Sequence, residues 1–254
     1  MSELYHVGLT PEQGAKYAIL PGDPGRVEKI AQLLENPQFV ACRREYKTYA
    51  GTLAGERVLV TSTGIGGPSA AIAVEELYMT GVRNFIRVGT CGGMQHQVMS
   101  GDMVVATAAV RMEGTSKEYV PIEYPAAADF DVTCALVDAA RHLNKPFHTG
   151  VVQCKDSFYG QHDPGRMPVG VELLNKWDAW VKAGCLASEM ESAALYTVAG
   201  ILRARAGCVL SVIWNQEREK AGLSNEPCHD TQAAIEVAVE AIRILISYNR
   251  QDSQ

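Results

Sequence analysis

Short apolar runs alternate with longer amphipathic stretches along most of the chain. The runs at residues 58–62 and 208–214 are rich in β-branched residues, which is typical of buried strands. Between such runs, apolar residues recur three or four positions apart, most clearly at residues 231–248, as in helices that pack on one side. The pattern predicts strands connected by helices, which favours a mixed or parallel sheet with helices on both faces.

The expected elements follow one another without a repeat or a low-complexity tract. Strands are expected at residues 17–20, 58–62, 84–89, 102–107, 149–154 and 208–214, with a short extended run at 185–188. Helices are expected at residues 24–34, 66–78, 131–143, 173–183, 191–205 and 231–248. In such sheets, ligands bind at the carboxyl ends of the strands, so a site is expected there.

Composition narrows the class of protein. The chain has 254 residues, 47% of them hydrophobic, enough for the core of one domain spanning residues 1–254. The net charge of −6 includes no basic block, so nucleic acid is not an expected partner. No apolar run is long enough for a bilayer and no secretory signal is visible, so no membrane partner is expected. Seven cysteines without a C-x-x-C pair favour reduced thiols in a cytoplasmic protein over zinc or disulfides.

Three glycine-rich turns follow predicted strands: PGDPGR at residues 21–26, STGIGGPS at 62–69 and RVGTCGG at 87–93. Glycine leaves backbone N–H groups open to an anion, and a helix N-terminus adds free donors. Arg26 and Arg87 add forked donors that match phosphate oxygens, and Thr90 adds a hydroxyl. One such turn is usually only a tight turn, but three with two arginines indicate an oxyanion site. P-loop and dinucleotide motifs are absent from the sequence.

A second motif, SEMESAA at residues 188–194, joins the short extended run to a predicted helix. The helix dipole favours a carboxylate at that point, so Glu189 is interpreted as a helix-start residue. Glu191 has a sharper interpretation, because a carboxylate can accept hydrogen bonds from two adjacent sugar hydroxyls. Met190 could pack on a ribose face, although methionine more often fills a core.

A third motif, DSFYGQHD at residues 156–163, follows the strand expected to end at residue 154. Phe158 could stack on a flat heterocycle, and Gln161 offers a donor and an acceptor to an amide-like edge such as that of uracil. His162 titrates near neutral pH and could protonate a departing base, whereas an ordinary loop histidine would only lie on the surface. The segment is therefore interpreted as a base-binding loop.

The motifs PGDPxR, STGIGGPS, RVGTxG and EMESA occur in this order with matching spacing. From residue 6 to residue 214 the chain resembles the nucleoside phosphorylase-I family, and within it the uridine phosphorylases. The resemblance implies a three-layer α/β/α sandwich around a mixed, partly closed sheet. It also implies reversible phosphorolysis of uridine to uracil and ribose 1-phosphate, with inorganic phosphate as co-substrate and no organic cofactor. The implied assemblies are dimers, and typically hexamers built as trimers of dimers.

The resemblance assigns roles to residues at matching positions. The implied phosphate contacts are Gly22, Arg26, Arg87 and Thr90, with Arg44 from the neighbouring subunit. The implied ribose contacts are Met190 and Glu191, with His6 from the neighbouring subunit. The base contacts are Phe158, Gln161, His162 and Gln216. A monovalent cation, typically potassium, is implied between subunits at Glu45, Ile65 and Ser69, whose simpler interpretations are a surface acid, a core residue and a helix-start hydroxyl.

Two segments depart from the uridine phosphorylases, which usually read F-Y-P-G-Q-E-R and later V-N-R. This chain reads FYGQHD at residues 158–163 and IWNQER at residues 213–218, so both base-site arginines are absent and Gln216 stands at the second position. The loss leaves pyrimidine specificity open. An imidazolium at His162 could supply the missing charge and a proton, so the predicted catalytic residues are His162, Arg87 and Glu191.

Other functions stay open at this point. Purine-specific relatives carry an aspartate in an S-D pair after the late strand, where this chain has VIWN at residues 212–215. A nucleosidase that uses water shares that aspartate and usually lacks the full set of phosphate arginines. A binding-only protein on the same scaffold would have less need of an anion site beside a ribose site.

Overall fold

Ten strands form one sheet in the computed structural model, which describes residues 2–251. The strands are β1 (Tyr17–Pro21), β2 (Glu35–Arg43), β3 (Tyr46–Leu53), β4 (Glu56–Thr61), β5 (Asn84–Gly93), β6 (Met103–Met112), β7 (Ala126–Ala127), β8 (Phe147–Lys155), β9 (Ala187–Glu189) and β10 (Arg205–Asn215). The helices are α1 (Pro24–Ala31), α2 (Gly67–Met79), α3 (Thr115–Tyr119), α4 (Phe130–His142), α5 (Phe158–His162), α6 (Gly170–Lys182), α7 (Ser192–Ile201), α8 (Gln216–Lys220) and α9 (Gln232–Gln251). The predicted domain bounds, residues 1–254, extend beyond the described residues at both ends.

Part of the sheet closes on itself. The strand order is β10-β6-β8-β9-β5-β1-β4-β3-β2, and β10 also pairs with β5. Strands β5, β10, β6, β8 and β9 therefore form a barrel-like ring, and the other main strands extend from it as an open sheet. β5 is parallel to β1 and β10 but antiparallel to β9. The expected mixed, partly closed sheet is confirmed.

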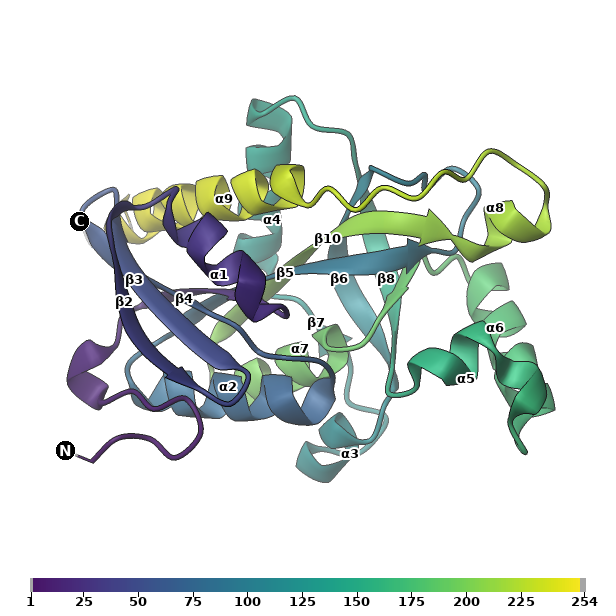
Figure 1. Cartoon of the computed structure of the whole chain (residues 1–254), viewed down its shortest axis with the longest axis horizontal. Coiled ribbons are helices and arrows are strands. Elements are labelled where there is room, and N and C mark those ends of the chain that lie inside the picture. The colour runs from purple at the N-terminus through teal and green to yellow at the C-terminus, as the bar shows by residue number, and fades with distance from the viewer. Residues whose placement is uncertain (1, 252–254) are drawn as a thin grey trace.

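Helices cover both faces of the sheet (Figure 1). On one face, α1, α4 and α9 share an apolar cluster with strand residues such as Ile19 and Val60. On the other face, α2 and α7 share a cluster with Ala18 and Leu59. Neighbouring residues of β1 and β4 thus enter opposite clusters, as the pleat of a strand requires. This confirms the expected three-layer α/β/α arrangement.

The apolar stripe expected near the C-terminus is buried in α9, which lies beside α4 (Figure 1). Its members are at most 6% exposed: Ile235, Ala238, Val239, Ile242, Leu245 and Ile246. Full burial of one large aliphatic side chain contributes about 1.5–3 kcal/mol, so this face holds the helix in place. Within the described residues, no helix combines the length and the apolar composition needed to span a bilayer.

Two helices are shorter than expected, and one hairpin was not predicted from the sequence. α1 ends at Ala31 rather than at residue 34, and α7 ends at Ile201, because the chain re-enters the sheet at Arg205. β2 and β3 form an antiparallel hairpin that turns at Arg44, which has a positive φ of 53°. β2 is an exposed edge strand with Pro37 near its start, so it lacks the alternation that predicts strands.

The strand register brings the three sequence motifs together. Ser188 of β9 pairs with Gly92 of β5, and Glu189 pairs with Cys154 of β8. β8 ends one residue later, at Lys155, immediately before the DSFYGQHD segment. The ends of β5, β8 and β9 therefore lie side by side at the closed part of the sheet.

Candidate active site

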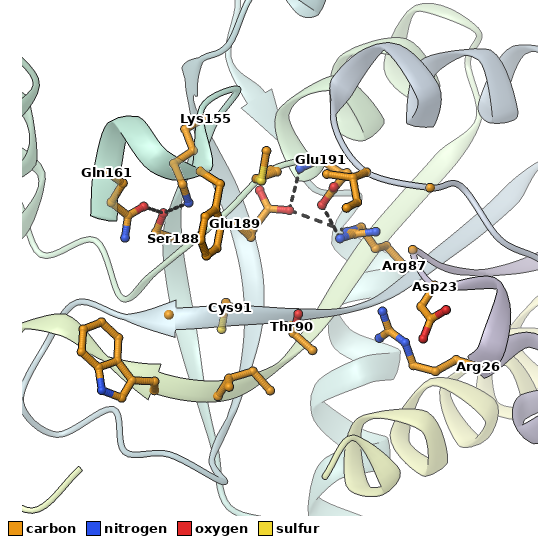
Figure 2. Close-up of a pocket in the computed structure, with 18 of the residues that line it drawn as sticks. Asp23, Arg26, Arg87, Thr90, Cys91, Lys155, Gln161, Ser188, Glu189 and Glu191 are labelled. Carbon is orange, nitrogen blue, oxygen red and sulfur yellow. Dashed lines mark hydrogen bonds and ion pairs between the residues drawn. The ribbon is translucent and has the colours of Figure 1, made fainter. Parts of the chain in front are cut away.

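A cavity of about 1020 Å³ lies along the second half of β5 (Figure 2). The predicted site residues that line it are Gly22, Arg26, Glu45, Ile65, Arg87, Thr90, Phe158, Gln161, His162, Met190 and Glu191. The predicted residues outside its lining are His6, Arg44, Ser69 and Gln216. In Figure 2, Arg26 and Arg87 occupy one end, and Lys155 and Gln161 occupy the other.

Gly22 and two arginines converge at the first end of the cavity. A Cβ placed on Gly22 would lie 3.7 Å from Nη1 of Arg87 and 3.8 Å from Nη2 of Arg26. Asp23 holds the turn by accepting a hydrogen bond of 2.8 Å from the backbone N–H of Gly25, and Pro24 starts α1. This end therefore presents two guanidinium groups beside a bare backbone, the arrangement that suits an oxyanion.

Several of the guanidinium donors at this end are not used by the protein groups that the structure describes. Burial and the charge of Arg87 lower the pKa of Arg26. Burial is the largest single influence on Arg87 and acts to lower its pKa, but neighbouring groups led by the Glu191 carboxylate together outweigh it and raise that pKa. Arg87 is 5% exposed, and its Nε and Nη1 have no hydrogen-bond partner among the described residues. The Glu189 carboxylate lies 3.6 Å from Nε, so donors remain for a bound anion.

Glu191 is fixed in the middle of the cavity by two donors. Nη2 of Arg87 donates to one carboxylate oxygen, and the backbone N–H of Gly66 donates to the other at 2.7 Å. Gly66 has a φ of 92°, which glycine adopts without strain. Burial raises the pKa of Glu191, and the charge of Arg87 opposes that rise. A carboxylate has about four acceptor positions, so roughly two remain for hydroxyl groups.

Glu189 has the helix-start role that the sequence indicated. Its carboxylate accepts hydrogen bonds from the backbone N–H groups of Glu191, at 2.9 Å, and of Ser192, at 3.0 Å. Ser192 is the first residue of α7, so these bonds satisfy donors that a helix start leaves free. They also fix the turn that brings Met190 and Glu191 to the cavity.

The segment expected to be a base-binding loop is the short helix α5. Ser157 caps it by accepting a hydrogen bond of 2.9 Å from the backbone N–H of Gly160. Phe158 and His162 are four residues apart and therefore share one face, with ring centroids 4.3 Å apart. The His162 ring lies 6.1 Å from that of Trp214. These rings, tilted by 38° and 52° to one another, form an aromatic wall that suits a heterocycle.

His162 is the titratable group of this wall. Burial and the positive charge of Lys155 lower its pKa from the ordinary value of about 6.5. The imidazole is therefore neutral at neutral pH, and the imidazolium considered from the sequence forms only in more acidic solution. A neutral imidazole still carries one N–H that can donate to a base.

Lys155 is a site residue that the sequence analysis missed. It ends β8, is 5% exposed, and donates from Nζ to Oγ of Ser188 at 2.6 Å. Ser188 is in turn 2.5 Å from Oε1 of Gln153 and 2.6 Å from Oε1 of Gln161. Nε2 of Gln161 donates to Oε1 of Gln216 at 3.2 Å, which places Gln216 behind the wall. The sequence offered one indication of this role: a lysine stands at the end of an apolar strand, directly before the DSFYGQHD motif.

His6 and Arg44 lie apart from the cavity of their own chain. Nδ1 of His6 is 2.6 Å from Oε1 of Glu76, and the backbone N–H of His6 donates to the same carboxylate. Arg44 lies exposed at the turn between β2 and β3, with its guanidinium carbon 5.9 Å from the centre of the Tyr5 ring. A role for either residue in this cavity therefore requires a second copy of the chain.

The residues of the predicted cation site are only partly together. Oγ of Ser69 donates to Oε1 of Glu45 at 2.7 Å, and this bond is the main cause of the lowered pKa of Glu45. Ile65 is 78% exposed, so its interpretation as a core residue is wrong. Two neighbouring oxygens fit part of the shell of an oxygen-liganded cation. Within the described residues, no group of three His, Cys, Asp or Glu side chains could hold a metal ion.

Known proteins that resemble the chain over most of its length include phosphorylases. The family described as the phosphorylase superfamily matches residues 16–248. A uridine phosphorylase of Treponema pallidum is 55% identical, with 98% of this chain and 95% of that protein covered. A uridine phosphorylase of Thermococcus kodakarensis is 45% identical, with 97% and 88% covered. A guanosine phosphorylase of Halorubrum lacusprofundi is 44% identical, with 78% of each chain covered.

Proposed function

The chain belongs to the phosphorylase superfamily, and we propose that within it the protein is a uridine phosphorylase, a pentosyltransferase. It cleaves uridine with inorganic phosphate and gives uracil and ribose 1-phosphate, reversibly. The observation that carries this proposal is one cavity with an arginine pair at one end and an aromatic and amide wall at the other. A nucleoside and an oxyanion can occupy such a cavity at the same time.

Phosphate binds at the arginine end. Arg26 and Arg87 donate to its oxygens, and Gly22 leaves room for the anion to approach the backbone. The Thr90 hydroxyl adds a further donor. In the proposed dimer, Arg44 of the partner subunit completes the shell, since Arg44 is outside the cavity of its own chain and lies exposed at the turn between β2 and β3. These contacts position the phosphate and balance its charge.

Ribose lies over the middle of the cavity. Glu191 accepts hydrogen bonds from two ribose hydroxyls with the carboxylate capacity that Arg87 and Gly66 leave open. Met190 packs against the sugar, and His6 of the partner subunit reaches it from the other side. The arrangement places C1′ between the phosphate and the base.

The chemical step is a displacement at C1′. The C1′–N1 bond lengthens, its electron pair moves into the uracil ring, and positive charge develops on the ribose. A phosphate oxygen then forms the new bond to C1′ from the face opposite the base. Phe158 stacks on the uracil, Gln161 and His162 hold its polar edge, and Gln216 holds the Gln161 amide from behind. A neutral His162 donates its N–H to the base as negative charge builds there.

The active unit is a dimer, and hexamers of three such dimers are the proposed assembly. His6 and Arg44 support this, because both lie outside the cavity of their own chain and can reach such a cavity only from a second copy. A potassium ion at Glu45, Ser69 and the backbone of Ile65 would stabilise that interface, since one chain supplies only part of a coordination shell. The free cysteines of the chain support a reducing, cytoplasmic location.

Guanosine is the second candidate substrate, because a guanosine phosphorylase is among the similar proteins. Uracil and guanine both present a ring carbonyl next to a ring N–H, so the same amide wall can face either base. A panel of uridine, deoxyuridine, thymidine, guanosine and inosine, each with and without phosphate, separates these possibilities when base release is measured. Uridine cleavage that depends on phosphate supports the proposal. Cleavage without phosphate indicates a nucleosidase, and binding without turnover indicates a binding protein.

A further inference from the structure

Lys155 is buried at the base end of the cavity with donor capacity to spare. Its side chain carries three N–H donors when charged, and the bond to Oγ of Ser188 uses one of them. Among the described residues, this is its only hydrogen bond. Lys155 lines the cavity together with Gln161 and His162, so its remaining donors are available to a ligand there.

The charge of Lys155 is not neutralised by a contact with an acid. Its hydrogen-bond partner is a hydroxyl, and the carboxylates of Glu189 and Glu191 act on it from a distance. Burial lowers the pKa of Lys155, and those two carboxylates oppose the change. The positive charge of Lys155 acts on the aromatic wall, because it is one of the two causes that lower the pKa of His162. A cation therefore faces the place where the base lies.

Lys155 and Gln161 share Ser188 as a hydrogen-bond partner. An ammonium can only donate, so Ser188 accepts from Lys155 and has one hydrogen left to give. The oxygens nearest to Ser188 are Oε1 of Gln153 and Oε1 of Gln161, and the hydroxyl donates to one of them. Nε2 of Gln161 donates one of its two hydrogens to Oε1 of Gln216 and keeps the other. Both residues line the cavity, so Lys155 and Gln161 each keep N–H donors for a ligand there.

We infer that Lys155 is a catalytic residue whose ammonium donates to a carbonyl oxygen of the base and stabilises the departing base anion. The inference rests on the proposed phosphorolysis. The electron pair of the breaking C1′–N1 bond delocalises onto the ring oxygens, and a buried, preorganised cation stabilises that charge more than water does. Lys155 keeps its proton throughout. The nitrogen released from C1′ is protonated afterwards by solvent, because the neutral imidazole of His162 can donate a hydrogen bond but not its proton.

The same geometry selects bases with a carbonyl group. A carbonyl oxygen accepts hydrogen bonds from the donors of Lys155 and Gln161. An amino group at the same ring position is itself a donor, so it cannot accept these bonds and leaves the protein donors unpaired. Leaving buried donors unpaired is costly, so bases with an amino group there are rejected. For contact at C4, where uracil has a carbonyl and cytosine an amino group, we therefore expect uridine to be cleaved and cytidine to be excluded by this pair of residues.

The test compares uridine with 5-fluorouridine in the wild type and in Lys155→Met. Methionine has a similar length and no charge, and Lys182→Met, at an exposed lysine of α6, is the matched control. Fluorine stabilises the leaving anion by itself, so it reduces the need for the cation. We expect Lys155→Met to lower kcat for uridine by about 10²–10³-fold and to lower kcat for 5-fluorouridine by clearly less. A lysine that only supported the fold would lower both rates equally.

Two further measurements keep the inference testable if Lys155→Met folds poorly. Lys155→Arg retains the charge, and we expect its rate loss to be smaller than that of Lys155→Gln when both unfold at the same temperature. In NMR titrations, the pKa of His162 should rise in Lys155→Gln, because a nearby positive charge has been removed. Equal losses in the Arg and Gln variants, with no change in the His162 pKa, would overturn the inference.

Failure of the inference and failure of the proposed function give different results. A wild type that releases no uracil from uridine and phosphate overturns the proposed function, and the inference with it. A wild type that is active, with Lys155→Met retaining at least a third of its kcat on both substrates, overturns the role of Lys155 alone. A rate loss in Lys155→Met that is partly reversed by the fluorinated substrate supports both.

Discussion

At the scale of single residues, Arg87 connects the anion end of the cavity to the sugar position. It donates to Glu191 and faces Gly22 with Nη1, while two of its nitrogens have no hydrogen-bond partner among the described residues. We expect Arg87→Ala to raise the KM for phosphate and to lower kcat by about 10²–10³-fold. Steady-state kinetics with varied phosphate measures both, with Arg83→Ala, an exposed arginine just before β5, as control. An unchanged KM for phosphate would contradict the anion site.

His162 has a different expected signature, in its pH dependence. Because its pKa is lowered, its charge is already lost in neutral solution. We expect kcat to stay level between about pH 7 and 8, since no further proton leaves this group there. We also expect His162→Ala to lower kcat by about 10²-fold, and His142→Ala, an exposed histidine of α4, to have no effect. A steady fall of kcat across that range would show that the imidazolium is the active form.

Many site residues were predictable because their chemistry is local in sequence. Gly22, Arg26 and Arg87 stand in glycine-rich turns after apolar runs, and such turns are recognisable without a structure. Lys155 was not predictable in the same way. Its role depends on the register of β8 against β9, which sets Ser188 between Lys155 and Gln161, and the position of a lysine before a motif does not reveal that long-range pairing.

At the scale of elements, the packing of β10 against α4 depends on a glycine. A Cβ on Gly207 would lie 2.5 Å from Cγ1 of Val132 and 3.0 Å from Cδ1 of Leu136, both on α4. We expect Gly207→Ala to lower the free energy of unfolding by about 1–3 kcal/mol, because the helix must move outward. Denaturant unfolding measures this, with Gly165→Ala as control, since a Cβ at Gly165 meets no atom within 4 Å. Equal stability of the two variants would contradict the close packing.

The elements that the sequence did not predict share a physical reason. β2 is an exposed edge strand whose partner on one side is β3, so burial imposes no alternating pattern on it. α5 is a single turn, too short for a period, and it forms because Ser157 caps it and α6 packs against it. Buried elements such as α9 were predicted because burial of one face requires apolar residues at regular spacing, and this spacing is visible in the sequence.

At the scale of the whole molecule, the proposed site is shared between two chains. In a dimer of Arg87→Ala with Arg44→Ala, one site carries both substitutions and the other carries neither. We therefore expect two nearly inactive variants to regain activity when co-expressed, up to about a quarter of the wild-type value if pairing is random. Uridine phosphorolysis by the co-purified mixture measures this. No recovery, despite mixed dimers detected with two affinity tags, would place Arg44 outside the partner's site.

The central claim is that phosphate itself attacks the sugar while the base leaves from the opposite end of one cavity. Phosphorus NMR of a reaction of uridine with inorganic phosphate identifies the sugar product directly. The account predicts one equivalent of ribose 1-phosphate for each uracil released, and neither product when phosphate is left out. Free ribose as the product, or uracil release at the same rate without phosphate, would contradict it.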